Sequence, residues 1–188
     1  MTKVPKNPSP KPIQVKLDNP FNSEKNMTRV CLFVKDPEED FKNLLDQLKL
    51  PCIADAIGFD RLKREFKQYK DKRALIADFD FFLADLRIYK MLPEVLGKEF
   101  YQRKVYPAPI KMHGFDNKEL EKQLNNAAAC TYFMPGNGPN YSLRIGRINQ
   151  SDKDLARNTA DALAQALGNL ACWDEGIDFG NVQQVSLR

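Results

Sequence analysis

The chain has 188 residues, of which 43% are hydrophobic and 29% charged, and its formal net charge is +4. This length allows one domain or two small lobes, and the composition is ordinary for a globular protein, which argues against disorder of the whole chain. No apolar run approaches the roughly 20 residues that a membrane-spanning helix needs, and residues 1–10 lack the apolar core of a secretory signal. We therefore expect an intracellular protein with no membrane partner.

The amino-terminal segment has no hydrophobic period. Residues 1–12 contain four prolines and several lysines, which predicts an extended or disordered arm. Apolar and polar residues then alternate over residues 13–17, which predicts a short strand with one exposed face. Residues 18–20 end this strand with turn-forming side chains.

A buried strand and an amphipathic helix follow. Residues 29–34 (RVCLFV) are typical of a strand that is buried on both faces of a parallel sheet. Asp36 as N-cap and Pro37 at the first position indicate a helix start, and the apolar spacing after them predicts a helix to about residue 48. Residues 52–57 predict a second short strand or a turn of helix.

The next segment is strongly basic. Residues 61–73 (RLKREFKQYKDKR) carry seven bases and two acids. The expected structure is a helix with Asp60 as its N-cap, in which Leu62, Phe66 and Tyr69 share one face and the bases occupy the other.

Three more elements complete this part of the chain. We expect a buried strand over residues 74–78, a helix over 81–91, and a short helix over 93–98 that ends at a glycine. Strand and helix thus alternate over residues 29–97, which predicts a small three-layer α/β lobe with a parallel sheet. No GxGxxG motif follows Val34, so this lobe is not a dinucleotide-binding fold.

The pattern changes after residue 98. Residues 103–112 contain two prolines and no period, which predicts a connection between lobes. The later elements expected are a helix over 117–129, hairpin strands over 130–134 and 141–148, a helix over 151–167 capped by Ser151, and a strand over 182–187.

These elements predict an α/β chain with two lobes. An α+β lobe with a split β-α-β arrangement is expected from residues 1–24 and 112–188, which include the basic, proline-rich arm. A Rossmann-like α/β lobe of residues 26–108 is expected as an insertion into it, because the first strand lies far in sequence from its partners.

Four stretches carry a resemblance to a known family. They are VKLDNPF at residues 15–21, VCLFVK at 30–35, the segment 76–110 with its Leu-Gly-Lys and proline-containing return, and the segment 141–167 with its Ile-Gly-Arg strand end and Asp-Leu-Ala-Arg-Asn helix start. In this order they resemble the ribosomal protein L1 family. The segment 99–104 departs from the Gly-Pro-Arg-Gly pattern of the ribosomal members, so the resemblance is closest to the eukaryotic L1-domain ribosome-biogenesis factors.

The resemblance implies a function. It implies a two-lobe, monomeric L1-like protein without catalysis or cofactor that binds structured rRNA or pre-rRNA in pre-ribosomal particles of the nucleolus. An alternative stays open, in which the chain docks on pre-ribosomal proteins and makes little direct contact with RNA. Salt dependence separates the two, because phosphate contacts weaken steeply with salt.

Basic residues of the predicted α+β lobe are the candidate RNA ligands. Arg147 occupies the family's basic position after Gly146, and Arg144 precedes it in the same expected strand. Lys11 and Lys16 lie beside or on the strand that is expected to neighbour it. Ordinary surface charge is the alternative interpretation of all four.

The basic segment 61–73, with a net charge of +5, is a second candidate surface. Contact with RNA, contact with a protein, and a solvated helix face all remain open for it. Its candidate residues are Arg61, Lys63, Arg64 and Lys67.

Candidates for catalysis or metal binding are few. An enzyme would have to use Asp78, Asp80 or Asp85. Asp78 and Asp80 are expected at the carboxyl end of a strand, where paired carboxylates suit magnesium, but helix capping and first-turn charge are the preferred explanation. His113, the single histidine, is expected in an exposed loop, and the glycines at 136–138 are expected in a hairpin turn. Nothing assembles a nucleophile, a base and an orienting group, so we expect no enzyme.

The four cysteines show no metal-ligand spacing. Cys31, Cys52, Cys130 and Cys172 are each surrounded by apolar residues, and no pair has CxxC spacing. We expect reduced, mostly buried thiols.

Overall fold

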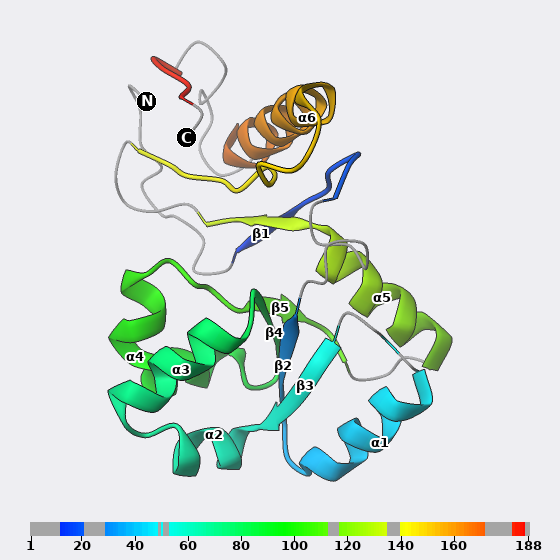
Figure 1. Cartoon of the computed structure of the whole chain (residues 1–188), viewed down its shortest axis with the longest axis vertical. Helices are drawn as coiled ribbons and strands as arrows, with labels where there is room; N and C mark the ends of the chain where they lie inside the picture. Colours follow the sequence, from blue (N-terminus) through cyan, green and yellow to red (C-terminus); the bar gives the residue numbers. More distant parts are fainter. Residues whose placement is uncertain are drawn as a thin grey trace. The chain divides into compact units, whose positions relative to one another are not determined.

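A computed structural model describes residues 12–20, 29–48, 50, 53–112, 117–134, 140–171 and 182–186 (Figure 1). The chain divides into two compact units, which are described separately here. Unit 1 comprises Met1–Phe21 and Ala129–Arg188, and unit 2 comprises Asn22–Ala128. The second division therefore follows residue 128, whereas the sequence pattern places a change of lobe near residue 110.

Unit 2 is built on a parallel sheet with the strand order β3-β2-β4-β5. Its strands are β2 (Val30–Val34), β3 (Ile53–Gly58), β4 (Phe81–Asp85) and β5 (Ala108–Ile110). Its helices are α1 (Glu38–Leu48), α2 (Phe59–Glu65), α3 (Tyr69–Asp78), the 3-10 turn Tyr89–Met91, α4 (Leu92–Gln102) and α5 (Asn117–Ala129).

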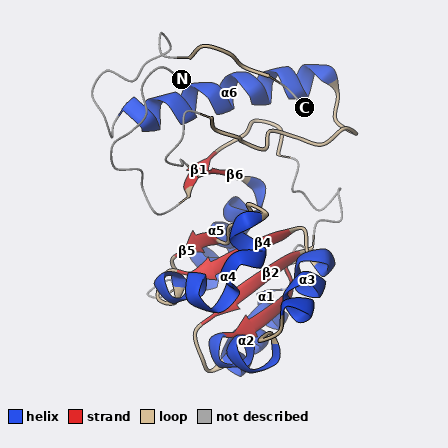
Figure 2. Ribbon diagram, turned by 90° about the vertical axis from the view of Figure 1, so that its left-hand side faces the viewer, coloured by secondary structure: helices blue, strands red, loops and turns tan. Residues whose placement is uncertain are grey.

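Helices cover both faces of this sheet (Figures 1 and 2). α3 and α4 lie on one side, and α1 and α5 lie on the other. Alternate strand residues such as Cys31 and Phe33 point to the α3 and α4 side, where they form one buried cluster with Leu75, Leu96 and Phe100. All five residues of β2 are buried, as expected for a central parallel strand.

Two expected elements of unit 2 are wrong: an expected strand is part of a helix, and an expected helix contains a strand. Residues 74–78 end helix α3, not a strand, and residues 81–91 contain strand β4 and a 3-10 turn, not a helix. Short apolar runs do not distinguish the two structures by period alone. Leu75 is buried while its neighbours Ala74 and Ala77 are exposed, a one-sided burial that suits a helix.

The basic segment forms two helices, not one. α2 ends at Glu65 and α3 begins at Tyr69, whose side chain is 66% exposed, so Tyr69 does not share the buried face of Leu62. The N-cap position of α2 is Gly58, and Asp60 lies in its first turn. The Asp36 carboxylate accepts the backbone N–H of Asp60 at 3.0 Å, which links the loop after β2 to α2.

The end of unit 2 also differs from expectation. The proline-containing segment 103–112 includes β5, which completes the sheet beside β4. Gly97 was expected to end a short helix, and it interrupts α4 with a φ of 65° and ψ of −157°, a conformation open to glycine. The helical segment then resumes and continues to Gln102.

Unit 1 contains a two-stranded antiparallel sheet and one long helix. β1 (Ile13–Val15) pairs with β6 (Thr131–Phe133), and α6 (Asp152–Ala171) packs on β1. The expected strand at 141–148 is wrong, because residues 140–147 have no regular secondary structure. Residues 182–186 are likewise not a strand.

The alternation of apolar and polar residues over 141–148 still predicted which side chains of this segment face the core. Tyr141, Leu143 and Ile145 pack against the core formed by β1, β6 and α6. The hydrophobic period therefore identified the core-facing side chains, although it does not report whether a neighbouring strand supplies backbone partners.

The thiols give a first testable prediction. Cys31 and Cys130 are 0% and 5% exposed, and burial, followed by the nearby Asp55 carboxylate, raises the pKa of the Cys31 thiol. Cys52 and Cys172 lie outside the described residues. When serine replaces these two, the remaining thiols should react with a bulky maleimide only after denaturation, because burial blocks access to both and the raised pKa of Cys31 also disfavours its thiolate. Rapid labelling of both native thiols would contradict this.

Candidate functional site

Two hydrogen bonds join Lys16, the residue after β1, to Gln165 of α6. The backbone N–H of Lys16 donates to the Gln165 side-chain oxygen at 3.0 Å, and its carbonyl accepts the Gln165 amide nitrogen at 2.7 Å. The Lys16 side chain is exposed. One candidate RNA ligand therefore stands on a fixed backbone and presents its ammonium group to solvent.

Asn158 is the polar centre of unit 1. Its side chain is 0% exposed, and its oxygen accepts the backbone N–H of Asn19 at 3.1 Å. Its amide nitrogen donates to the carbonyls of Asn19 at 2.8 Å and Ile145 at 3.0 Å. One buried amide thus joins the chain after β1, the 141–148 segment and α6.

The side-chain amide of Gln150 fixes the backbone of Arg147. The backbone N–H of Arg147 donates to the Gln150 side-chain oxygen at 3.0 Å, and the Gln150 amide nitrogen donates to the Asn19 carbonyl at 3.1 Å. A Cβ atom at Gly146 would lie 2.3 Å from a Leu155 methyl carbon and 2.5 Å from the Gln150 oxygen, so any larger residue would displace these side-chain ends. The Ile-Gly-Arg motif therefore allows this segment to approach α6 closely.

The start of α6 is capped as the sequence predicts. The Ser151 hydroxyl accepts the backbone N–H of Asp154 at 3.2 Å and donates to its carboxylate at 2.7 Å. This part of α6 also presents two exposed cations, Lys153 and Arg157, which sequence reasoning missed. The Asp-Leu-Ala-Arg-Asn helix start contains Arg157 and was the available signal.

The basic residues of unit 1 are spread along α6. The backbone of Lys16 is held by Gln165, in the second half of α6, and the backbone of Arg147 is held by Gln150, just before the helix begins. Arg144 is exposed and precedes Arg147 on the same segment. Lys11 lies outside the described residues. Hydrogen bonds thus hold the backbones of Lys16 and Arg147 at different places along α6. Cations that are spread in this way suit contacts with separate phosphate groups.

In unit 2, Arg61 is engaged within the protein. Its guanidinium lies 3.0 Å from the Glu38 carboxylate and 2.8 Å from the Glu65 carboxylate. Burial tends to raise the pKa of Glu38, but hydrogen bonds from Lys42, the Gly58 N–H and Arg61 outweigh it and hold that pKa below its usual value. Arg61 thus links α2 to α1, which leaves it less suited to bind a partner.

Two more bases of the segment have internal partners. Arg73 makes two hydrogen bonds to Glu99, at 2.9 and 3.1 Å, and these raise the pKa of Arg73 and lower that of Glu99. Lys72 is only 9% exposed, and its ammonium donates to the Val95 carbonyl at 2.5 Å, just before the interruption at Gly97. A cation near the carboxyl end of a helical segment is stabilising, because that end of the helix dipole is negative.

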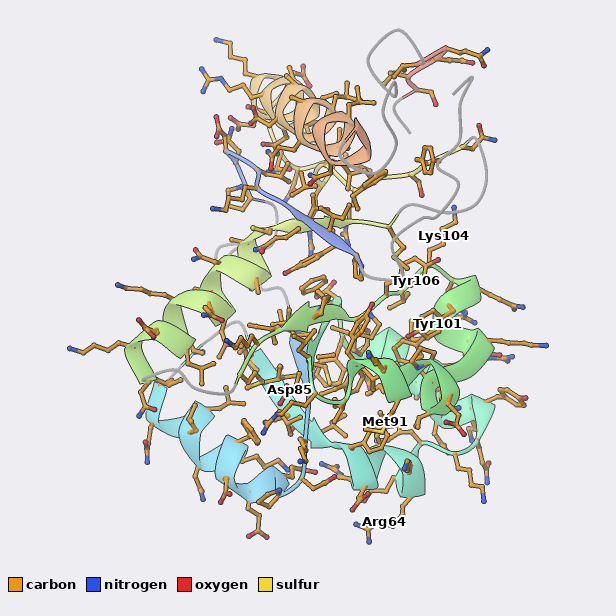
Figure 3. The ribbon with its side chains drawn as sticks, turned by 180° about the vertical axis from the view of Figure 1, so that it is seen from behind. Arg64, Asp85, Met91, Tyr101, Lys104 and Tyr106 are labelled. Atoms are coloured by element: carbon orange, nitrogen blue, oxygen red, sulfur yellow. The ribbon has the colours of Figure 1, made fainter. Side chains whose placement is uncertain are left out.

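The other bases of the segment remain on the surface. Lys63 lies over the Phe59 ring, 4.3 Å from its centre, and Arg64 extends away from unit 2 (Figure 3). Lys67 and Lys70 are exposed, and no carboxylate among the described residues is paired with either. The accessible charge of this segment is therefore smaller than its composition indicates.

The carboxylate candidates have structural partners. Asp85 is 1% exposed and accepts hydrogen bonds from the Arg87 side chain at 2.8 and 2.5 Å and from the Arg87 backbone at 3.0 Å. Asp80 accepts the Arg29 N–H at 3.0 Å. Asp78 is the last residue of α3 and Asp80 precedes β4, so the expectation that both follow a strand at residues 74–78 is wrong.

Other chemical candidates add little. His113 and the glycine loop at 136–138 lie outside the described residues. Within the described ranges, no group of three or more histidine, cysteine or acidic side chains is arranged to hold a metal ion. No helix in the described part of the chain has the length and apolarity to cross a membrane.

Comparison with known proteins identifies one family. The profile of the ribosomal protein L1p/L10e family matches residues 1–187. A putative ribosome biogenesis protein of Schizosaccharomyces pombe is 32% identical, over 81% of this chain and 40% of its own length. The ribosomal L1 domain-containing protein 1 of Mus musculus is 31% identical, over 79% and 34%. The ribosome biogenesis protein UTP30 of Saccharomyces cerevisiae is 29% identical, over 71% and 54%. The chain thus spans about half, or less, of the length of these relatives.

Proposed function

Because the chain belongs to the ribosomal protein L1p/L10e family, we propose that it is a non-catalytic ribosome-assembly factor that binds structured rRNA or pre-rRNA. Its relatives include proteins named for ribosome biogenesis in two yeasts, which supports a place in pre-ribosomal particles. The proposal includes a monomer that acts in the nucleolus without a cofactor, alongside pre-ribosomal proteins.

One observation carries the RNA part of the proposal. The side chains of Asn158, Gln150 and Gln165 fix the backbones on which Arg147 and Lys16 stand. Fixed backbones lower the entropy cost of binding, since fewer groups must be ordered when the ligand arrives. Phosphate contacts from these cations would position unit 1 on a folded RNA, as such contacts do in other complexes.

The test neutralises this surface. The unit 1 variant carries Lys16→Gln, Arg144→Gln and Arg147→Gln, and the control variant carries Lys35→Gln, Lys118→Gln and Lys122→Gln on exposed positions of unit 2. Binding to transcribed pre-rRNA fragments is measured by mobility shift over a series of salt concentrations. Each phosphate contact that is lost should reduce the slope of log affinity against log salt by roughly one.

The two variants have the same change in net charge, so they separate a specific surface from general attraction. We expect the unit 1 variant to lose affinity and slope, while the control variant keeps both. Circular dichroism should show both variants folded, because exposed charges contribute little stability and Arg147→Gln keeps the backbone N–H that Gln150 accepts. Equal slopes for wild type and the unit 1 variant would refute the RNA-binding surface.

A further inference from the structure

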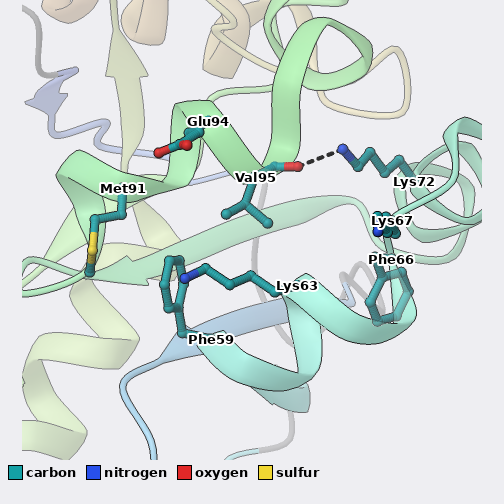
Figure 4. Close-up of a pocket in the computed structure, with 8 residues that line it drawn as sticks. All are labelled: Phe59, Lys63, Phe66, Lys67, Lys72, Met91, Glu94 and Val95. Atoms are coloured by element: carbon teal, nitrogen blue, oxygen red, sulfur yellow. Dashed lines mark hydrogen bonds between the residues drawn. The ribbon is translucent and has the colours of Figure 1, made fainter.

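Unit 2 has a surface cavity between α2 and α4 that the proposed function does not use (Figure 4). Its volume is about 340 Å³. Phe59, Lys63 and Phe66 line it from α2 and the turn after it, and Met91 and Val95 line it from the other side. We call this cavity the α2–α4 pocket.

The walls of the pocket combine charged side chains with partly exposed apolar ones, among them Phe66, Met91 and Val95. Met91 is 44% exposed, and Phe66 and Val95 are only partly buried, although both pack against the core of unit 2. Apolar surface of this kind gains free energy when another apolar group covers it. The pocket therefore favours a ligand with at least one apolar side chain.

The rim of the pocket is basic. The Lys63 ammonium lies over the Phe59 ring at 4.3 Å, and Lys67 lines the pocket from the turn after α2. Lys72 also lines it and is anchored to the Val95 carbonyl. The two accessible ammonium groups, those of Lys63 and Lys67, complement a ligand that places carboxylates beside an apolar group.

Two features disfavour a nucleic acid. The Glu94 carboxylate lines the same pocket and would repel a phosphate that enters it. The face of the Phe59 ring is covered by Lys63, so a base would have to displace the ammonium before it could stack there. A peptide avoids both costs, because its carboxylates can stay at the lysine rim while an apolar side chain enters.

We propose that the α2–α4 pocket docks an acidic peptide segment of a partner protein, which inserts one apolar side chain between Phe66, Met91 and Val95 and pairs its carboxylates with Lys63 and Lys67. This interaction does not depend on RNA binding by unit 1. It gives the chain a protein contact on one unit and an RNA contact on the other.

The test uses fluorescence anisotropy with the full chain. The labelled peptide has one phenylalanine flanked on both sides by aspartates and glutamates, and a second peptide carries serine in place of the phenylalanine. The pocket variant is Lys63→Glu with Lys67→Glu, and its matched control is Lys70→Glu with Lys98→Glu, two exposed lysines that do not line the pocket. A third variant, Glu94→Lys, removes the one acidic group of the pocket.

The acidic phenylalanine peptide should bind wild type roughly tenfold more tightly than it binds the pocket variant, because reversed charges oppose its carboxylates. The control should match wild type, Glu94→Lys should bind more tightly, and the serine peptide should bind weakly. Three results would overturn the proposal: no binding of the peptide to wild type, equal loss in the control, or loss of single-stranded RNA binding in the pocket variant with peptide binding unchanged. The last result would place RNA in the pocket.

Discussion

Replacing Asn158 with leucine should lower the free energy of unfolding of unit 1 by about 3 kcal/mol, because buried polar groups lose their partners. The substitution removes three hydrogen bonds and leaves the N–H of Asn19 and the carbonyl of Ile145 unsatisfied inside the protein. The Asn19 carbonyl keeps one partner, the Gln150 side chain. Leucine is similar in size, so the loss comes mainly from unmatched polar groups and not from a cavity.

Hydrogen exchange can assign this loss to unit 1. In Asn158→Leu, the backbone amides of β1 and β6 should exchange faster, while those of β2 in unit 2 should keep their protection. Asn169→Leu is the matched control, since Asn169 is a half-buried amide of the same helix whose side chain donates within that helix, to the Gln165 carbonyl at 2.7 Å. An Asn158→Leu protein as stable as this control would show that the buried amide does not hold the unit together.

Phe82→Ala should have the largest effect on unit 2, with a loss of about 3–5 kcal/mol in the free energy of unfolding. Phe82 is the second residue of β4 and is 1% exposed. Its ring stacks on Phe33 with centroids 5.6 Å apart, and it meets Phe100 and Phe79 edge to face at 5.1 and 6.1 Å. Alanine would remove these contacts and leave a cavity that packed neighbours fill only in part.

Urea denaturation followed by a signal from unit 2 measures this loss. Phe82→Leu is the graded control, because it retains most of the buried volume and should lose clearly less stability than Phe82→Ala. If Phe82→Ala and Phe82→Leu lowered the free energy of unfolding by the same small amount, the ring contacts of Phe82 would not be central to the stability of this core.

The sequence pattern predicted the continuous apolar strand at residues 30–34, and the spacing of Leu44, Leu45 and Leu48 belongs to helix α1 as expected. Residues 53–58 form a strand, one of the two structures that the pattern left open there. Residues 74–78 and 81–85 were assigned to the wrong types, because each is a short apolar run and only tertiary packing decides whether one side or both are buried. β5 was missed, since a strand of three residues with Pro109 at its centre carries almost no period.

The candidate site was predictable only in part. Composition located the basic segment 61–73, but it could not show that Arg61, Lys72 and Arg73 are engaged by groups far away in the sequence. Asn158 was missed, although it interrupts the apolar face formed by Leu155 and Ala162 on the same helix. A polar residue on such a face indicates a buried hydrogen-bonding role.

Binding of pre-ribosomal RNA by unit 1 can be tested in cells by crosslinking followed by sequencing of the recovered RNA. The wild-type chain should recover pre-rRNA at defined positions. The unit 1 variant (Lys16→Gln, Arg144→Gln, Arg147→Gln) should lose these positions at equal protein level, and the control variant should retain them. Recovery of the same pre-rRNA positions by all three proteins, or of no pre-rRNA by wild type, would contradict the account.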